Sequence, residues 1–336
     1  FVDFPPGLVD ELYKYLYSIN PYTYILKGLT EYGPDFHVLK IEGTPWSTLD
    51  YESIKVRLML IELFKFMSSR YFEVLLTTET KKHLGDTIYF RRCMDPELPP
   101  FPHKPYIDVE SHIFITLNSW NYLQVIGLSP KNPENEEFYT TIRECLKENW
   151  LPGIEESVLE KEGFPVVEFK GQKWEPCYQA KCWEPRHDVE EILARQMLCF
   201  LLSDLSQLGF MLSHTMSSSV NQNAKSNFYI RKALTPVAHS HALITMYIGD
   251  EMEDELHIIN GDNDLIRIFS QEFTTSYTPG VHEEGDMFGC GDVGEDGLSA
   301  EAWKVRIKGK PISDLGKDRN NALIFQTAFL SALGEL

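Results

Sequence analysis

The chain has 336 residues, a formal net charge of −19 and a hydrophobic fraction of 43%. This length corresponds to about two domains of ordinary size, and the apolar content excludes a wholly disordered chain. With 50 acidic against 31 basic residues, the chain repels phosphate backbones and anionic lipid surfaces, which argues against nucleic acid or a membrane as its main partner.

The first predicted elements are a helix over Leu8–Ile19, whose apolar residues follow helical spacing, and a strand over Phe36–Ile41. The strand ends in a Gly-x-Pro-Trp corner formed by Gly43, Pro45 and Trp46. Glycine and proline favour such a turn, and a tryptophan there is typical of a side chain that closes a hydrophobic core. A ligand groove lined by the tryptophan is the functional alternative.

The strand and its corner return twice further along the chain. A second strand begins at Pro165 and ends at Gly171 and Trp174, and a third ends at Gly309 and Pro311. The corner glycines lie roughly 130 residues apart, which is too long for a solenoid repeat and fits a duplicated domain. We therefore interpret the corner as a structural motif of a tandem repeat.

An apolar helix follows each copy of the corner. The predicted helices cover residues 51–67, 190–208 and 320–336, and an apolar character on nearly all sides is typical of a helix buried on more than one face. The recurring apolar positions are Ile54, Leu60 and Leu63, then Ile192, Leu198 and Leu201, then Ile324, Leu330 and Leu333.

Short strands fill the space between these helices. After the first two helices we predict strands at 72–76 and 210–213, each the start of a hairpin. Helices at 136–150 and 264–273 close the two copies. Three further pairs of segments match between the copies: IYFR at 88–91 with FYIR at 228–231, SHIFIT at 111–116 with SHALIT at 240–245, and LQVI at 123–126 with LHII at 256–259.

The predicted fold class is α+β, with tandem duplicated modules of antiparallel sheet covered on one face by helices and incomplete units at both ends. The expected domains are residues 1–35 as the C-terminal part of an incomplete module, 36–163 and 164–298 as two full modules, and 299–336 as the start of a third.

Two insertions break the symmetry of the copies. The first, Glu175–His187, contains Cys177, Cys182 and His187, which are residue types that bind zinc. A fourth ligand is not local, and the alternative is a loop with reduced cysteines. The second, His282–Ser299, is acidic and rich in glycine, and we expect a mobile surface loop or linker there.

A histidine pair is the other candidate for chemistry. His239 and His241 flank one residue of a predicted strand and would point to the same face, as metal ligands or an acid–base pair. Asp262 and Asp264 are the acids that could complete such a site. His112 occupies the place of His241 in the first copy, and this recurrence favours a structural role for the histidines.

The sequence contains no nucleotide-binding, nucleophile-elbow or zinc-protease motif. Its six scattered cysteines are typical of a reducing compartment, so we expect a cytoplasmic location. We predict a non-enzymatic scaffold that binds protein partners or itself and needs no cofactor. The alternatives are a metal-dependent or hydrolytic enzyme with a site between the modules, and a carrier of small ligands.

Overall fold

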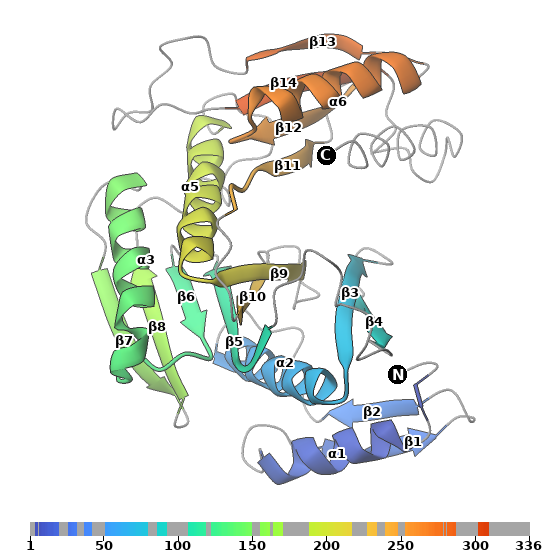
Figure 1. Ribbon diagram of the computed structural model, residues 1–336. Coiled ribbons are helices and arrows are strands. Elements are labelled where there is room, and N and C mark those ends of the chain that lie inside the picture. Colours follow the sequence, from blue (N-terminus) through green and yellow to red (C-terminus); the bar gives the residue numbers. More distant parts are fainter. Residues whose placement is uncertain are drawn as a thin grey trace. The chain divides into compact units, whose positions relative to one another are not determined.

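The computed structural model describes most of the chain, in two compact units (Figure 1). The described residues are 4–5, 7–19, 26–31, 37–41, 51–79, 86–92, 107–118, 122–149, 155–161, 164–170, 188–216, 227–233, 239–247, 253–277, 279, 281–286 and 302–308. The first unit comprises Phe1–Arg143, Pro152–Tyr178 and Leu205–Ala238, and the second Glu144–Leu151, Gln179–Asp204 and His239–Leu336.

Helices and strands alternate along the chain much as the sequence predicts. The described α-helices are α1 (Leu8–Ile19), α2 (Tyr51–Ser69), α3 (Glu136–Asn149), α5 (Asp188–Gln207) and α6 (Asn263–Ser276), with a 3₁₀ turn at Pro133–Asn135. The strands are β1 (Leu26–Glu31), β2 (His37–Ile41), β3 (Phe72–Glu79), β4 (Asp86–Arg92), β5 (Ile107–Asn118), β6 (Tyr122–Ile126), β7 (Glu155–Lys161), β8 (Phe164–Lys170), β9 (Phe210–Met216), β10 (Asn227–Ala233), β11 (Leu243–Tyr247), β12 (Glu253–Ile259), β13 (Val281–Asp286) and β14 (Ala302–Lys308).

The order of elements recurs. The succession β2-α2-β3-β4-β5-β6-α3-β7 is followed by β8-α5-β9-β10-β11-β12-α6-β13, and β14 begins it again. This recurrence suggests a tandem duplication. The expected third helix at 320–336 and all corner residues (Gly43, Pro45, Trp46, Gly171, Trp174, Gly309 and Pro311) lie outside the described residues.

All pairings between the described strands are antiparallel, as expected. The first unit contains a six-stranded sheet of order β7-β8-β6-β5-β10-β9 and two separate hairpins, β1-β2 and β3-β4. The second unit contains a four-stranded sheet of order β11-β12-β14-β13. We expected a new module to begin at residue 164, where β8 starts. Strand β8 pairs with β7 and β6, which both precede that expected boundary.

The expectation that each sheet is covered on one face only is wrong for the six-stranded sheet. Adjacent residues of β5 point to opposite faces, yet Ile113, Phe114 and Ile115 are all buried, and so are Val125 and Ile126 of β6. The segments HIFIT and LQVI are nearly continuous apolar runs, and such runs are typical of strands buried on both faces.

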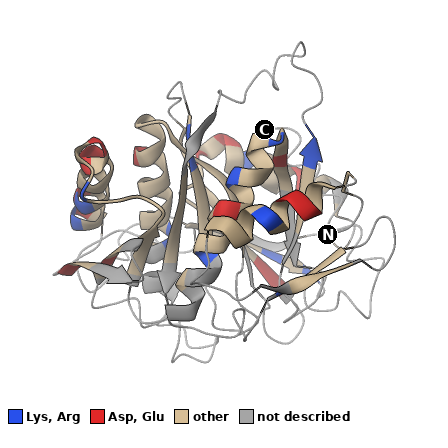
Figure 2. Cartoon of the chain, turned by 90° about the horizontal axis from the view of Figure 1, so that it is seen from below, with Lys and Arg blue, Asp and Glu red and all other residues tan. Residues whose placement is uncertain are grey.

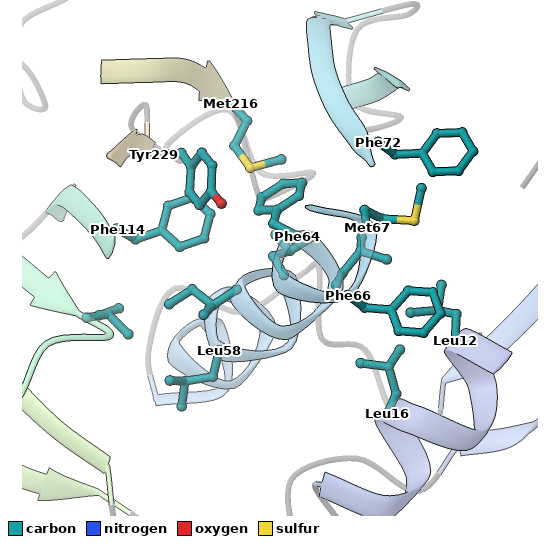
Figure 3. Packing of buried hydrophobic residues seen from close by; sticks show 14 of the residues in the cluster. Leu12, Leu16, Leu58, Phe64, Phe66, Met67, Phe72, Phe114, Met216 and Tyr229 are labelled. Carbon is teal, nitrogen blue, oxygen red and sulfur yellow. The ribbon is translucent and has the colours of Figure 1, made fainter. Parts of the chain in front are cut away.

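Helix α2 covers one face of the six-stranded sheet. Figure 3 shows Phe64 pointing toward Phe114 and Tyr229 of the sheet, with ring centroids 6.3 and 4.6 Å away, while Phe66 lies on the side of α2 that meets Leu12 of α1. Full burial of each such side chain stabilises the fold by roughly 1.5–3 kcal/mol. The prediction that this helix is buried on more than one face is therefore confirmed.

In the second unit, helices pack against both faces of the four-stranded sheet. Phe269 of α6 packs with Leu256, Ile258 and the strand β14, whereas Ile192 of α5 contacts Ile259 on the neighbouring position of β12. Successive residues of a strand face opposite ways, so the two helices cover opposite faces of this sheet.

Three strands were not predicted: β1, β7 and β13. The sequences of β7, EESVLEK, and β13, VHEEGD, carry few apolar residues because both strands lie at sheet edges, where backbone pairing on one side suffices. The expectation of a loop over His282–Ser299 is therefore wrong for residues 282–286, and residues 287–299 lie outside the described part of the chain.

None of the described helices combines the length and apolar character needed to cross a membrane.

Candidate functional site

The predicted histidine pair lies just before a strand. We expected the strand to begin at Ser240, but β11 begins at Leu243, so His239 and His241 precede it. Their rings are 6.5 Å apart at 82°, and His239 is exposed while His241 is half-buried. Ser203 of α5 holds His241 through two contacts: its Oγ accepts from the His241 backbone N at 3.0 Å and lies 3.3 Å from Nδ1. Burial lowers the pKa of His241.

The acids proposed beside this pair have other tasks. Asp262 caps α6 by accepting from the backbone N of Leu265 at 2.7 Å, and exposed Asp264 pairs with Arg267 at 3.3 Å. Within the described ranges, no three His, Cys, Asp or Glu side chains are grouped closely enough to hold a metal ion.

The zinc prediction rests mainly on residues outside the described part of the chain, namely Cys177, Cys182 and His187. Cys199 and His214 are distant residues that folding could bring in as a fourth ligand. Cys199 is buried in α5, and burial raises its pKa to about 12. A thiol with that pKa is protonated at neutral pH and is a poor ligand or nucleophile. His214 lies in β9 against the rings of Phe64 and Tyr229.

The structure instead brings together a row of polar side chains across the six-stranded sheet. Asn227 of β10 stands opposite Thr116 of β5, which stands opposite Gln124 of β6, which stands opposite Glu168 of β8. Asn227, Thr116 and Gln124 are each less than 5% exposed. Gln124 donates from Nε2 to Glu168 Oε1 at 2.7 Å, so the row is joined by hydrogen bonds beneath α2.

Arg57 of α2 inserts its guanidinium into this row. Its Nε donates to Asn227 Oδ1 at 2.7 Å, and its Nη1 makes a longer contact of 3.5 Å to Gln124 Oε1. Asn227 in turn donates from Nδ2 to the carbonyl oxygen of Met216 at 3.0 Å. Burial lowers the pKa of Arg57 to about 10, which still leaves it charged at neutral pH. A buried charge needs such partners, so the row fixes α2 at one position on the sheet.

An aromatic and histidine cluster continues the same face of the sheet. The Tyr229 hydroxyl is hydrogen-bonded to Nδ1 of His112, which lies two residues before Phe114, the cross-strand partner of Tyr229. His112 and Tyr229 are each 1% exposed, and burial raises the pKa of the Tyr229 hydroxyl. The hydrogen bond supports a structural role for His112.

The second unit has its own polar group on the face covered by α5. Glu255 Oε2 lies 3.0 Å from His257 Nε2, and Arg306 donates from Nε to Glu255 Oε1 at 2.9 Å. These contacts, chiefly the one from His257, lower the pKa of Glu255 to about 2. Both units therefore carry an ordered group of polar side chains on one face of a sheet.

Sequence reasoning missed Arg57, Gln124 and Asn227. One signal was available: Arg57 follows Ile54 by three residues in an otherwise apolar helix, and Arg195 follows Ile192 by the same interval. A charged residue repeated at one position of two apolar helices indicates a buried polar contact rather than an exposed face.

One domain family matches the chain in two stretches, residues 1–91 and 111–231. Both stretches end within corresponding hairpins, on β4 and on β10. No curated protein and no solved structure matches the chain. The two stretches cover more than half of the sequence, so the chain belongs to this domain family.

Proposed function

We propose that this chain, a member of a domain family that matches it twice, is a non-enzymatic scaffold of tandem modules that binds other protein chains. The observation that carries the proposal is the repeated arrangement of a helix over an antiparallel sheet, α2 in the first unit and α5 in the second. Repetition of one architecture multiplies equivalent binding surfaces within a chain.

The use made of the polar groups supports this proposal. Arg57, Gln124 and Asn227 satisfy one another beneath α2, which is what a helix-positioning device requires. A catalytic group needs access to substrate and a pKa suited to proton transfer. The buried guanidinium and thiol have neither property, because Arg57 stays charged and Cys199 stays protonated near neutral pH.

Charge supports protein rather than nucleic acid as the partner. The chain carries a net charge of −19, and Figure 2 shows basic and acidic residues interspersed on the described elements in that view. A nucleic-acid surface needs a concentrated basic patch. The proposed scaffold works in the cytoplasm without a cofactor.

Native mass spectrometry on the protein purified from its own source tests the proposal. The expected species contain this chain together with another protein chain or with further copies of itself, in fixed ratios. Denaturing mass spectrometry of the same sample supplies the bare chain mass as the control. A single chain that carries a stoichiometric metal ion or organic molecule, with no protein partner, would overturn the scaffold proposal in favour of the enzyme or the carrier.

A further inference from the structure

The hairpin β3-β4 of the first unit has the same design as the hairpin β9-β10. Each begins directly after a residue with positive φ, Tyr71 at 62° and Gly209 at 86°. The segment IYFR of β4 corresponds to FYIR of β10, which places Tyr89 at the position of Tyr229. The two family matches end at this same point in each hairpin.

The two hairpins differ in their neighbours. Strand β10 pairs with β9 on one edge and with β5 on the other, whereas β4 pairs with β3 alone among the described strands. The exposed fractions of the two corresponding tyrosines differ accordingly: Tyr229 is 1% exposed and Tyr89 is 46% exposed. Leu75 of β3, at the bulge in this hairpin, is 56% exposed. The hairpin β3-β4 thus exposes a tyrosine, Tyr89, whose counterpart in β10 is buried.

The second unit shows the complementary difference. Its sheet order β11-β12-β14-β13 corresponds strand for strand to β5-β6-β8-β7 of the first unit. In the first unit, β5 continues to the hairpin β10-β9, while β11 ends the described sheet of the second unit. Strand β11 offers apolar residues at this edge, since Leu243 and Ile244 are only half-buried. Unpaired strand edges are templates for the addition of another strand.

We propose that the hairpin β3-β4 of one copy of this chain adds to β11 of a second copy, with β4 antiparallel to β11. The resulting sheet, β13-β14-β12-β11-β4-β3, has the order of the six-stranded sheet already present. This inference rests on the proposed function and names one partner and one surface for it.

The intrachain pairing of β10 with β5 fixes the register between copies. There, Phe228 pairs with Ile115, Tyr229 with Phe114 and Arg231 with His112. The corresponding pairs between copies are Ile88 with Ile244, Tyr89 with Leu243 and Arg91 with His241. In this register Tyr89 stands two positions from Arg91, the proposed partner of His241, just as Tyr229 stands two positions from Arg231, the partner of His112.

The first unit holds the hairpin ready for this contact. Phe90 packs against Phe64 and Phe4, with ring centroids 6.2 and 6.1 Å away. Since side chains alternate along a strand, the anchoring of Phe90 turns Tyr89 to the other face. The donor hairpin is therefore ordered before it binds, and a preorganised strand loses less entropy on binding.

Sedimentation velocity over a wide concentration range tests the assembly on the 336-residue chain. The expected result is a concentration-dependent multimer. Tyr89→Asp places a charge at the centre of the proposed contact between β4 and β11 and should weaken association at least about tenfold. The control Tyr71→Asp alters a more exposed tyrosine outside the strands, 74% exposed, and should leave association unchanged. A monomer at all concentrations, or equal effects of the two substitutions, would overturn the inference.

A disulfide between paired positions tests the register. Isotope-labelled chain with Tyr89→Cys is mixed with unlabelled chain with Leu243→Cys, because residues directly opposite across strands come within disulfide range. The expected product is a labelled–unlabelled peptide pair joining positions 89 and 243. Its absence in a multimeric sample would overturn the register. A strictly monomeric chain that nevertheless binds another protein in native mass spectrometry would remove this inference and leave the proposed function standing.

Discussion

Replacement of Asn227 by alanine tests whether the polar row holds α2 on the sheet. The Asn227 amide accepts a hydrogen bond from Arg57 and donates one to the Met216 carbonyl, at 2.7 and 3.0 Å. Both side chains are nearly inaccessible to water, with Asn227 1% and Arg57 7% exposed. Water therefore cannot readily replace the lost amide.

The size of the effect follows from these two bonds. A hydrogen bond to a charged group contributes about 1.5–3 kcal/mol, and a buried neutral bond about 1 kcal/mol. Asn227→Ala should therefore lower the free energy of unfolding by about 3 kcal/mol. Arg57→Met should cost less, about 1 kcal/mol, because it also removes a buried charge that burial already disfavours.

The double variant separates the contact from the two sites. Once Arg57 is methionine, loss of the Asn227 amide leaves no charge unsatisfied, so the double variant should be about 2 kcal/mol more stable than the sum of the single effects. Urea unfolding followed by circular dichroism provides the free energies. Hydrogen exchange of α2 and β10 reports whether the loss is local to this contact.

An exposed asparagine supplies the matched control. Asn263→Ala, at the exposed start of α6, should change stability by less than about 0.5 kcal/mol. Additive effects of Asn227→Ala and Arg57→Met, within about 0.5 kcal/mol, would refute the reasoning, because the two side chains would then not depend on each other.

Three further predictions concern single positions. Gly127→Ala should destabilise the first unit by about 2 kcal/mol or more, since Gly127 has φ +100° and an added Cβ would strike the carbonyl oxygen of His112, whereas Gly285→Ala, with open space around it, should be nearly neutral in the same thermal melts. Tyr229→Phe should cost about 1–2 kcal/mol in urea unfolding because it removes the hydroxyl partner of His112, and an unchanged midpoint would contradict that role. The folded state lowers the pKa of Glu255 from 4.5 to about 2, so its contribution to stability is present above pH 4.5 and is lost as the pH falls toward 2; acid unfolding of Glu255→Gln should lose that part of the pH dependence, and a profile identical to that of the parent chain would count against it.

The helices could be predicted from the sequence because their apolar spacing is strong. Leu8, Leu12 and Leu16 are buried in α1 as the periodicity requires. The edge strands β7 and β13 could not, because an edge strand is held by backbone hydrogen bonds and needs little apolar side-chain area. A charged sequence such as EESVLEK carries almost no signal of such pairing.

The candidate site was harder to predict than the fold. The close spacing of His239 and His241 predicted a paired site. The buried polar network is instead formed by Arg57, Gln124 and Asn227, which lie far apart in the sequence. No local spacing can indicate that residues 170 positions apart share a hydrogen bond. The pairing of β10 with β5 and of β5 with β6, together with the packing of α2 on this sheet, brings them together.

The place of β8 in the six-stranded sheet has a consequence for how the protein is made. The second edge of β6 is paired only after residues 164–170 have been synthesised, and the second edge of β5 only after residues 227–233. During synthesis, the apolar strands at the centre of the sheet therefore emerge well before their neighbours, and long-range pairing of this kind is slow and exposed to aggregation. A chain cut between β7 and β8 would keep β6 but lose the strand that covers its edge, so fragments of this protein should be cut after β10 instead.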